Sequence, residues 1–154
     1  ADAVKIPVIA AGGIADARGI AAAFALGAAG VQIGSAYLLC PEAKVSATHR
    51  VSLQTARDDG TVLTNVMTGR PARGFLTRVV REVGPMSDVA PDFPLAGGAL
   101  APLRAKAEAA GSGDFTTQWS GQAVALGKAI PAGELTKKLA ADALAQLQRL
   151  GATK

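Results

Sequence analysis

The sequence contains little cysteine, histidine or aromatic side chain, and it has no long apolar run. Its single cysteine, Cys40, excludes an internal disulfide and fits a reducing compartment, so we expect a cytoplasmic protein. Aromatic residues are 4% of the chain, and the basic residues behind the net charge of +4 are spread along it, which argues against a nucleic-acid-binding protein. No apolar run reaches the roughly 18 residues of a membrane-spanning helix, so we expect no membrane partner.

Candidates for catalysis are correspondingly few. His49 is the only histidine, and neither Thr48 nor Arg50 beside it is a carboxylate that could orient the ring, so we expect a packing or surface role. Cys40 has no basic neighbour in the sequence that would favour a thiolate, and we interpret it as a small buried apolar residue. For Trp119, a place in the core is favoured over a cofactor contact. We expect no metal site.

An apolar stretch interrupted by glycines dominates the beginning of the chain. Its parts are a strand at 6–11, an alanine-rich helix at 16–26 and a second strand at 30–33. The apolar runs are short and bounded by turn residues, which is typical of buried parallel strands, and the helix is long enough to be the crossover between them. We expect Asp16 to cap this helix at its start and Gly27 to end it.

Glycine turns follow both predicted strands. Gly12 and Gly13 follow the first strand, and Gly34 with Ser35 follows the second. In parallel α/β folds, ligands bind at this carboxyl end of the strands. The backbone N–H groups of residues without a Cβ are open to an anion, and Ser35 is placed to begin a helix whose free N–H groups face the same anion. This arrangement predicts a phosphate site; the alternative is that the glycines only permit tight turns.

The remainder of the chain is predicted to be mostly helical. We expect a helical turn at 36–39, helices at 42–56, 75–83, 99–110 and 134–150, a strand at 61–67, a loop at 69–74 and an irregular segment at 84–95. Trp119 and Gln122 are placed on a further helix within 115–130. Arg70 and Arg73 have guanidinium groups suited to an anion, but a structural role in their loop is the favoured interpretation.

Five motifs along the chain are similar to those of one enzyme family. They are IPVIAAGGIAD at 6–16, GAAGVQIGSA at 27–36, CPEA at 40–43, TGRPARG at 68–74 and WSGQ at 119–122. These motifs resemble the nitronate monooxygenases, formerly called 2-nitropropane dioxygenases, which are FMN-dependent TIM-barrel enzymes. The first two motifs are shared by several FMN barrels, whereas the later ones are more specific to this family. The resemblance extends over essentially the whole chain.

The resemblance implies that the chain is the C-terminal portion of a longer α/β protein. It would contain the last two strands of a TIM (β/α)8 barrel and a mostly helical region that covers the substrate. A complete barrel takes about 250 residues, and this chain has 154 residues and no initiator methionine. We therefore expect barrel units at 1–60, a smaller helical or irregular substrate domain at 61–130 and a terminal helix at 131–154.

The resemblance also implies a site for FMN. Its cofactor-binding residues would be those of the two glycine turns and the end of the second strand: Gly12, Gly13, Gln32, Ile33, Gly34 and Ser35. Gly13 would donate its backbone N–H to FMN, and Ser35, where family members often have threonine, keeps the hydroxyl. Gln122 is the candidate contact on the substrate side. The family's catalytic histidine lies in the N-terminal part of the barrel, so we expect no catalytic residue in this chain and do not assign that role to His49.

The implied reaction is the oxidation of an alkyl nitronate with O2 to a carbonyl compound and nitrite, with FMN as the cofactor. Because the family's histidine is absent, we expect the isolated chain to be inactive. It would need the missing N-terminal half, or it would self-associate through exposed sheet edges and apolar surface. Two alternatives are an FMN-dependent enoyl-acyl-carrier-protein reductase, which shares both glycine turns, and an inactive self-associating half-barrel.

Overall fold

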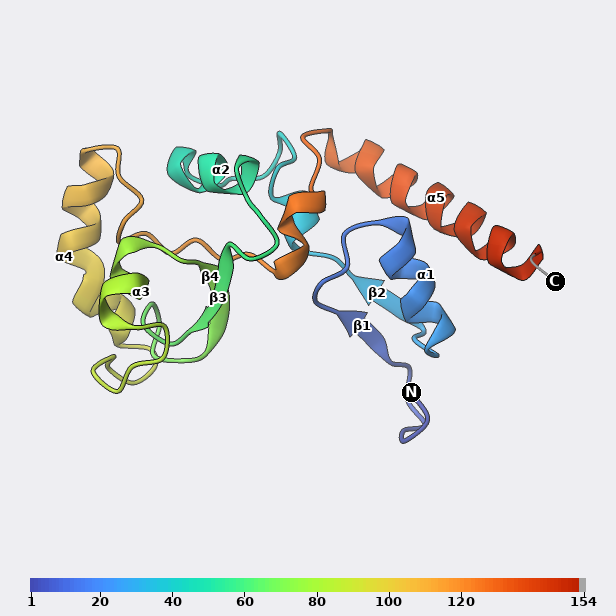
Figure 1. The fold of residues 1–154 in the computed structure, drawn as a ribbon, viewed down its shortest axis with the longest axis horizontal. Coiled ribbons are helices and arrows are strands. Elements are labelled where there is room, and N and C mark those ends of the chain that lie inside the picture. The colour runs from blue at the N-terminus through green and yellow to red at the C-terminus, as the bar shows by residue number, and fades with distance from the viewer. Residues whose placement is uncertain (153–154) are drawn as a thin grey trace. The chain divides into compact units, whose positions relative to one another are not determined.

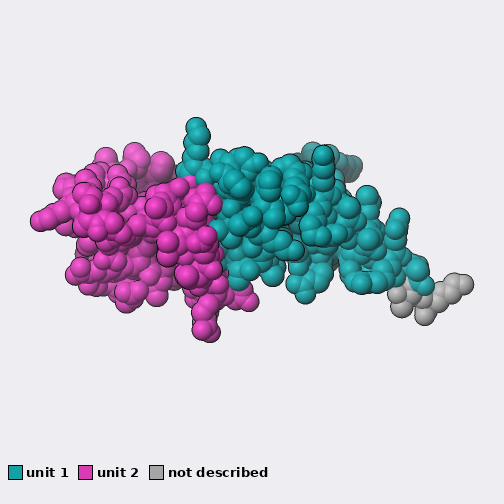
Figure 2. Space-filling view, turned by 90° about the horizontal axis from the view of Figure 1, so that it is seen from above, with its two compact units in different colours: residues 1–44, 123–154 teal, residues 45–122 magenta. Residues whose placement is uncertain are grey.

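The computed structural model describes residues 1–152, which form two compact units. Unit 1 consists of residues 1–44 and 123–154, and unit 2 consists of residues 45–122 (Figure 2). The terminal helix therefore belongs to the same unit as the first strands. The boundaries of these units differ from those of the three regions expected from the sequence, whose functional assignment stays a prediction.

Unit 1 begins with the strand, helix and strand predicted from the sequence. β1 (Ile9–Ala11) and β2 (Gly30–Gln32) pair in parallel, and α1 (Ala17–Ala25) is the crossover between them (Figure 1). β1 is shorter than the expected strand at 6–11, and Ile6 is 73% exposed. The expected burial of the first strand is therefore wrong for this chain, because the described sheet of unit 1 has two strands, too few to cover both of its faces.

Asp16 and Gly27 bound α1 as predicted. The Asp16 carboxylate accepts hydrogen bonds from the backbone N–H groups of Arg18 and Gly19, both at 3.0 Å, which satisfies donors of the first turn. Gly27 follows the C-cap residue Leu26 and has a φ of +87°, the left-handed geometry typical of the residue after a helix. Local sequence signals therefore determine both ends of this helix.

The C-terminal helix, α5 (Ala132–Ala152), packs against α1 and completes unit 1. Its first N–H group, that of Ala132, donates to both carboxylate oxygens of Glu42, at 3.0 and 3.1 Å. A residue of the CPEA motif thus caps a helix that is distant in the sequence. Buried side chains from both helices and from the segment after β2 form the core: Ile20, Cys40, Leu135, Leu139 and Ala143. Cys40 is buried, as predicted.

Two helical elements follow β2 along the chain. The first is the predicted turn, a 3-10 turn named η1 (Ser35–Tyr37). The second, α2 (Ala47–Gln54), is shorter than the helix expected at 42–56. Ser46 has extended backbone geometry and accepts the His49 N–H at 3.2 Å, so it caps the helix and the preceding residues cannot belong to it.

Unit 2 is built on an antiparallel strand pair, β3 (Thr61–Thr64) and β4 (Ala72–Phe75). The loop expected at 69–74 is therefore wrong, because its second half lies in β4. The Arg73 guanidinium donates to the Thr61 carbonyl at 3.0 Å across the pair. Pairing with β3, a tertiary interaction, overrides the local preference of glycine and proline for a loop.

Two helices and a buried cluster complete unit 2. α3 (Arg78–Val83) begins later than expected, because Phe75 is the last residue of β4, and α4 (Ala96–Ala109) is close to the predicted 99–110 helix. The buried cluster consists of Val66, Met67, Val79 and Val80. The Trp119 side chain packs against this cluster, which confirms its predicted place in the core.

The helix expected within 115–130 is wrong. Trp119 forms an isolated antiparallel bridge with Gly74, and the Phe75 N–H donates to the Gln118 carbonyl at 3.0 Å. In this fully described stretch, the helical geometry is limited to the 3-10 turn η2 (Gln122–Leu126). Residues before η2 therefore extend the sheet at the edge of β4 instead of forming a helix.

Candidate functional site

The parallel pairing brings the two glycine turns to the same end of the sheet. Ala11, the last residue of β1, lies opposite Gln32, the last residue of β2. Gly12 follows the first strand directly, and Gly34 lies two residues beyond the end of the second. The turns predicted to bind one anion are therefore neighbours at the carboxyl end of the strands, where ligands bind in parallel α/β folds.

The glycines of these turns are not required by packing within the chain. A Cβ at Gly12, Gly13 or Gly34 would meet no heavy atom of the described residues within 4 Å. Gly12 and Gly13 have φ values of +91° and +68°, which favour glycine by conformation. Gly34 has a φ of −110°, which any residue adopts, so strain does not explain its missing Cβ. A phosphate that approaches a backbone closely needs such open space, and these residues therefore fit a flavin phosphate.

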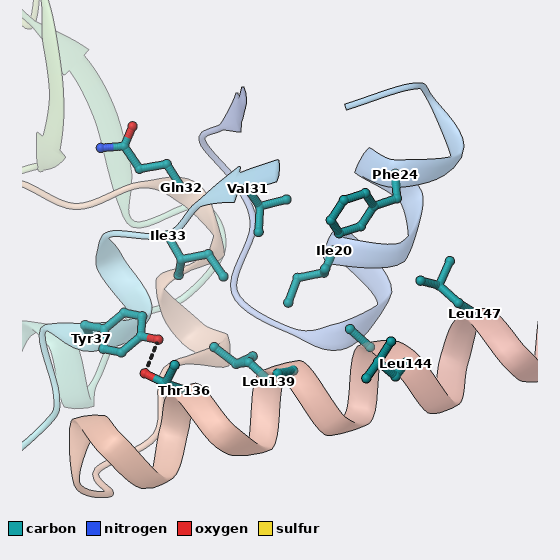
Figure 3. A pocket seen from close by; sticks show the side chains of 12 residues that line it. Ile20, Phe24, Val31, Gln32, Ile33, Tyr37, Thr136, Leu139, Leu144 and Leu147 are labelled. Atoms are coloured by element: carbon teal, nitrogen blue, oxygen red, sulfur yellow. Dashed lines mark hydrogen bonds between the residues drawn. The ribbon is translucent and has the colours of Figure 1, made fainter. Parts of the chain in front are cut away.

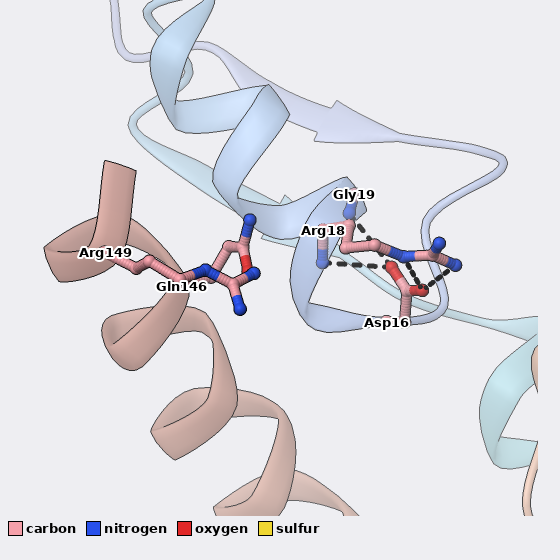
Figure 4. A network of polar contacts seen from close by, with 5 residues as sticks. All are labelled: Asp16, Arg18, Gly19, Gln146 and Arg149. Carbon is pink, nitrogen blue, oxygen red and sulfur yellow. Dashed lines mark hydrogen bonds and ion pairs between the residues drawn. The ribbon is translucent and has the colours of Figure 1, made fainter. Parts of the chain in front are cut away.

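Two backbone donors at the start of α1 already have a partner within the helix cap. Asp16 already accepts the N–H groups of Arg18 and Gly19, and its carboxylate pairs with the Arg18 guanidinium at 2.6 Å (Figure 4). Burial opposes the charged form of Asp16, but the hydrogen bonds from Gly19 and Arg18 outweigh it and lower the pKa of the carboxyl group. A second anion is not expected at this helix end, so the glycine turns themselves are the remaining candidate donors.

The second turn leads into a very short helix. η1 consists of Ser35–Tyr37, and no side chain caps its start at Gly34. A single 3-10 turn has little of the dipole of a longer helix, so the helix start predicted to face the anion is weaker than expected. Ser35 is half-buried, and its contact with a cofactor stays a prediction.

Gln32 and Ile33 lie in different environments. Gln32 is exposed, and Figure 3 shows its side chain extending away from Val31 and Ile33. Ile33 is half-buried and packs against the core of unit 1, so a ligand at the turn could reach its backbone but not its side chain. Contact of either residue with a cofactor stays a prediction.

Gln122, the candidate on the substrate side, belongs to unit 2. It is the first residue of η2, and its side chain is exposed, which leaves its amide group accessible to a ligand. Unit 2 contains neither of the glycine turns. A contact between Gln122 and a substrate therefore stays a prediction.

The TGRPARG motif has a structural role in unit 2. Gly69 has a φ of +85°, and a Cβ there would collide with the backbone of residues 91–93. The Arg70 guanidinium lies over the Phe93 ring, 4.6 Å from its centroid. Arg73 donates across the strand pair, as described above. Both arginines thus hold segments of unit 2 together, which supports the structural interpretation over anion binding.

His49 is buried in unit 2 and has the packing role predicted for it. Its ring meets the Phe75 ring edge-on, with centroids 6.1 Å apart and planes at 80°. Burial lowers the pKa of His49, and a hydrogen bond with the Trp119 backbone offsets part of this effect. The Nε2 atom is buried without a hydrogen-bond partner. The absence of a catalytic role for His49 stays a prediction.

Unit 1 also contains an apolar groove that was not predicted from the sequence. This groove has a volume of about 660 Å³ and is lined by residues of α1, β2 and α5, by Ile33 after β2 and by Tyr37 of η1 (Figure 3). The hydroxyl groups of Tyr37 and Thr136 are 2.9 Å apart and hydrogen-bonded. The helical spacing of leucines in α5 is the signal that could have indicated the groove, because Leu144 and Leu147 continue the apolar face beyond the buried core.

No helix among residues 1–152 combines the length and the apolar character needed to cross a membrane. Histidine, cysteine and carboxylate side chains in the same range do not form a group of three that could hold a metal ion.

Known proteins resemble this chain over most of its length. The family model described as "Nitronate monooxygenase" matches residues 1–142. The nitronate monooxygenase of Pseudomonas aeruginosa is 44% identical over 136 residues, which are 88% of this chain and 39% of that protein. A probable nitronate monooxygenase of Staphylococcus saprophyticus is 40% identical over 121 residues, which are 79% of this chain and 34% of that protein. The chain thus spans less than half the length of these relatives.

Two solved structures are similar in sequence and fold. Nitroalkane oxidase from Streptomyces ansochromogenes has a TM-score of 0.85 and 38% identity, and the match covers 97% of this chain and 42% of that chain. FabK from Thermotoga maritima has a TM-score of 0.77 and 32% identity, with coverage of 97% and 48%. The family match confirms the resemblance seen in the motifs. This chain therefore belongs to the nitronate monooxygenase family.

Proposed function

We propose that this chain is the FMN-anchoring part of an enzyme that oxidises alkyl nitronates with O2 to a carbonyl compound and nitrite. FMN, when bound, supplies the redox chemistry of that reaction. Membership of the nitronate monooxygenase family supports the reaction, and the fold shared with nitroalkane oxidase supports the placement of this chain within a longer protein. The remaining length of the relatives would supply the other strands of a TIM barrel.

The observation that supports this proposal most directly is the pair of adjacent glycine turns. The register of β1 and β2 places them side by side, and the space over Gly12, Gly13 and Gly34 is open. In this arrangement the N–H groups of Gly13 and Gly34 would donate to phosphate oxygens, and the Ser35 hydroxyl would add a further donor. The backbone at the end of β2 would complete the contacts.

The proposal assigns anchoring of the cofactor to this chain and the active-site base to a residue outside it. His49 is buried, its Nε2 atom has no hydrogen-bond partner and its ring bonds the Trp119 backbone, which supports this assignment. Gln122 would contact the substrate through its exposed amide. We therefore expect no significant oxidation of a nitronate such as propane-2-nitronate by the purified chain alone, and normal turnover by the chain alone would contradict the assignment.

A substitution at Gly34 tests the cofactor site. Gly34→Val places a branched side chain in the open space without backbone strain, so we expect the fold to persist and FMN affinity to fall by at least about tenfold. Gly133→Val is the matched control, because Gly133 also has no heavy atom near its Cβ position but lies in α5. Quenching of flavin fluorescence measures the affinity, with the chain alone and with the unmatched portion of the Pseudomonas aeruginosa relative added.

Equal FMN affinity of wild type and Gly34→Val would place the phosphate elsewhere, and no binding in either setting would contradict the FMN assignment. The same glycine turns also suit the alternative enoyl-acyl-carrier-protein reductase. Assays of the assembled protein separate the two functions. Nitrite release from a nitronate with O2 supports the proposal, whereas NADH-dependent reduction of an enoyl thioester supports the alternative.

A further inference from the structure

The second glycine turn leads into a helical turn that has little stability of its own. η1 is a single 3-10 turn of three residues, and no side chain caps its start at Gly34. The Tyr37 N–H donates to the Gly34 carbonyl at 2.9 Å, so the end of η1 holds the glycine turn directly. One isolated turn is only marginally stable in water, because it fixes several backbone dihedral angles for very few hydrogen bonds. The conformation of Gly34 and Ser35 therefore depends on what η1 contacts elsewhere in unit 1.

The Tyr37 side chain connects η1 to the first turn of α5. The hydroxyl groups of Tyr37 and Thr136 are hydrogen-bonded at 2.9 Å, as the dashed line in Figure 3 shows. Each hydroxyl carries one hydrogen, and that of Thr136 donates to the Ala132 carbonyl at 2.8 Å. Tyr37 is therefore the donor to Thr136. Two hydrogen bonds in series thus join η1 to the start of a helix of 21 residues.

Two further contacts hold the same segment against the start of α5. The Glu42 carboxylate accepts the Ala132 N–H, as described above. A Cβ at Gly127 would lie 3.3 Å from the Leu39 side chain and 3.9 Å from the Ala36 carbonyl oxygen, so the chain before α5 approaches η1 closely. Ala36 and Leu39 are both buried. The segment after β2 and the start of α5 are therefore joined by packing as well as by hydrogen bonds.

We propose that Tyr37 and Thr136 are positioning residues for the cofactor site. Their hydrogen bond holds η1 in the conformation in which Gly34 and Ser35 donate to the flavin phosphate, so less ordering is required when FMN binds. Both side chains act through the backbone of η1 and not through contact with FMN. The inference rests on the proposed function, because it concerns the phosphate contacts assigned there to the second glycine turn.

Hydrogen exchange without ligand tests whether the bond orders η1. Thr136→Val keeps the shape of the side chain and removes its hydroxyl. We expect the amides of Tyr37 and Leu38, which close the η1 turn, to exchange about threefold to fivefold faster, while the central turns of α5 are unchanged. Thr55→Val is the matched control, because the Thr55 hydroxyl also donates to the carbonyl four residues earlier but lies in unit 2.

FMN affinity tests whether this order serves the cofactor site. Quenching of flavin fluorescence is measured with the chain alone and with the unmatched portion of the Pseudomonas aeruginosa relative added. Thr136→Val and Tyr37→Phe should each raise the dissociation constant of FMN by about threefold to fivefold. The double variant should lose no more than either single variant, because both substitutions remove the same bond. Thr136→Ser, which keeps the hydroxyl, and Thr55→Val should stay within about twofold of wild type.

A general loss of stability would give a different pattern. Tyr37 lies outside α5, so a change in that helix cannot explain an effect that Tyr37→Phe shares with Thr136→Val. The proposal is overturned if either single variant binds FMN as tightly as wild type. It is also overturned if the two losses add in the double variant, or if Thr136→Ser does not restore the affinity.

Gly34→Val distinguishes failure of this inference from failure of the proposed function. Loss of FMN affinity in Gly34→Val, together with full affinity in Thr136→Val, would support the cofactor site and overturn the positioning role. If wild type binds no FMN in either setting, the cofactor site is contradicted, and faster exchange in Thr136→Val would then assign the bond to the stability of η1 alone.

Discussion

Among residues 1–152, the two sheets each have two strands, but they differ in how many of their strand edges have hydrogen-bond partners. In unit 2, β3 pairs with one edge of β4, and residues 118–120 bind the other edge: the Phe75 N–H donates to the Gln118 carbonyl, and the Ser120 N–H donates to the Arg73 carbonyl. In unit 1, β1 and β2 pair only with each other among the described strands. Unit 2 therefore satisfies its sheet from within the chain, whereas unit 1 does not.

The difference follows from the direction of the strands. Antiparallel strands close through a local connection, and a neighbouring segment can complete the edge, so a short sequence is sufficient. Parallel strands need a crossover for every added strand, so a parallel sheet is complete only when many units are present. The candidate cofactor site lies in the unit whose described sheet has only two parallel strands. Separate perturbation of the two units tests this comparison.

The largest effect is expected in the core of unit 2. Val80 is fully buried at 0% exposure, so Val80→Asp would bury a carboxylate without a partner and lower the free energy of unfolding of unit 2 by at least about 3 kcal/mol. Val89→Asp is the control, because Val89 is 78% exposed and its substitution should change stability by less than about 0.5 kcal/mol. Urea unfolding followed by the fluorescence of Trp119, the only tryptophan, measures both.

Hydrogen exchange extends this experiment to unit 1. If residues of unit 2 alone complete its sheet, Val80→Asp should speed hydrogen exchange at the amides of unit 2. The amides of α1 and α5 should still exchange at the wild-type rate. Simultaneous loss of protection in both units would show that they fold as one, and the comparison between a complete and an incomplete unit would not hold.

A medium effect is expected at the helix starts, where the units again differ. Asp16 accepts two backbone N–H groups at the start of α1, so Asp16→Ala should destabilise unit 1 by about 1 kcal/mol. Thr77 occupies the same position before α3 but makes no capping bond, and its hydroxyl is buried without a partner. Thr77→Ala should therefore change the stability of unit 2 by less than about 0.5 kcal/mol or raise it. Hydrogen exchange of the first turn of each helix checks both, and equal losses would contradict the assigned caps.

The contrast between the units also explains what the sequence could predict. Features set by neighbouring residues were predicted well: the crossover between two parallel strands, the Asp16 cap, and the glycine after α1 all follow from local steric and hydrogen-bonding preferences. The family motifs predicted that both glycine turns bind the cofactor, which stays a prediction. The predicted parallel pairing alone was sufficient to place those turns at the same end of the sheet.

Features set by contacts between distant segments were missed. Gly74 and Phe75 belong to β4 because β3 and the segment around Trp119 pair with them, and no local signal in the TGRPARG motif specifies this. The helix expected from 42 begins later because Ser46 caps it, and Glu42 instead caps α5. The groove of unit 1 depends on the packing of α5 against α1, so it could not be located before the fold was known.

The smallest effect is expected when the pH is lowered, and the pH at which stability falls should differ between the two units. Burial lowers the pKa of His49 in folded unit 2, so the His49 imidazole binds a proton more readily in the unfolded chain. The stability that neutral His49 contributes is fully present above the ordinary histidine pKa of about 6.5 and decreases as the pH falls below it.

The lowered pKa of Asp16 in unit 1 gives stability that is complete above the ordinary aspartate pKa of about 3.9 and is lost only as the pH falls through the folded value. Between about pH 6.5 and 4, unit 2 should therefore weaken while these groups leave unit 1 unchanged. Trp119 fluorescence and exchange of the α1 amides, each followed in urea across this range, measure the two responses. His49→Leu should remove the slope of unit 2, because no imidazole remains to be protonated; an unchanged slope would assign the acid response of unit 2 to another group.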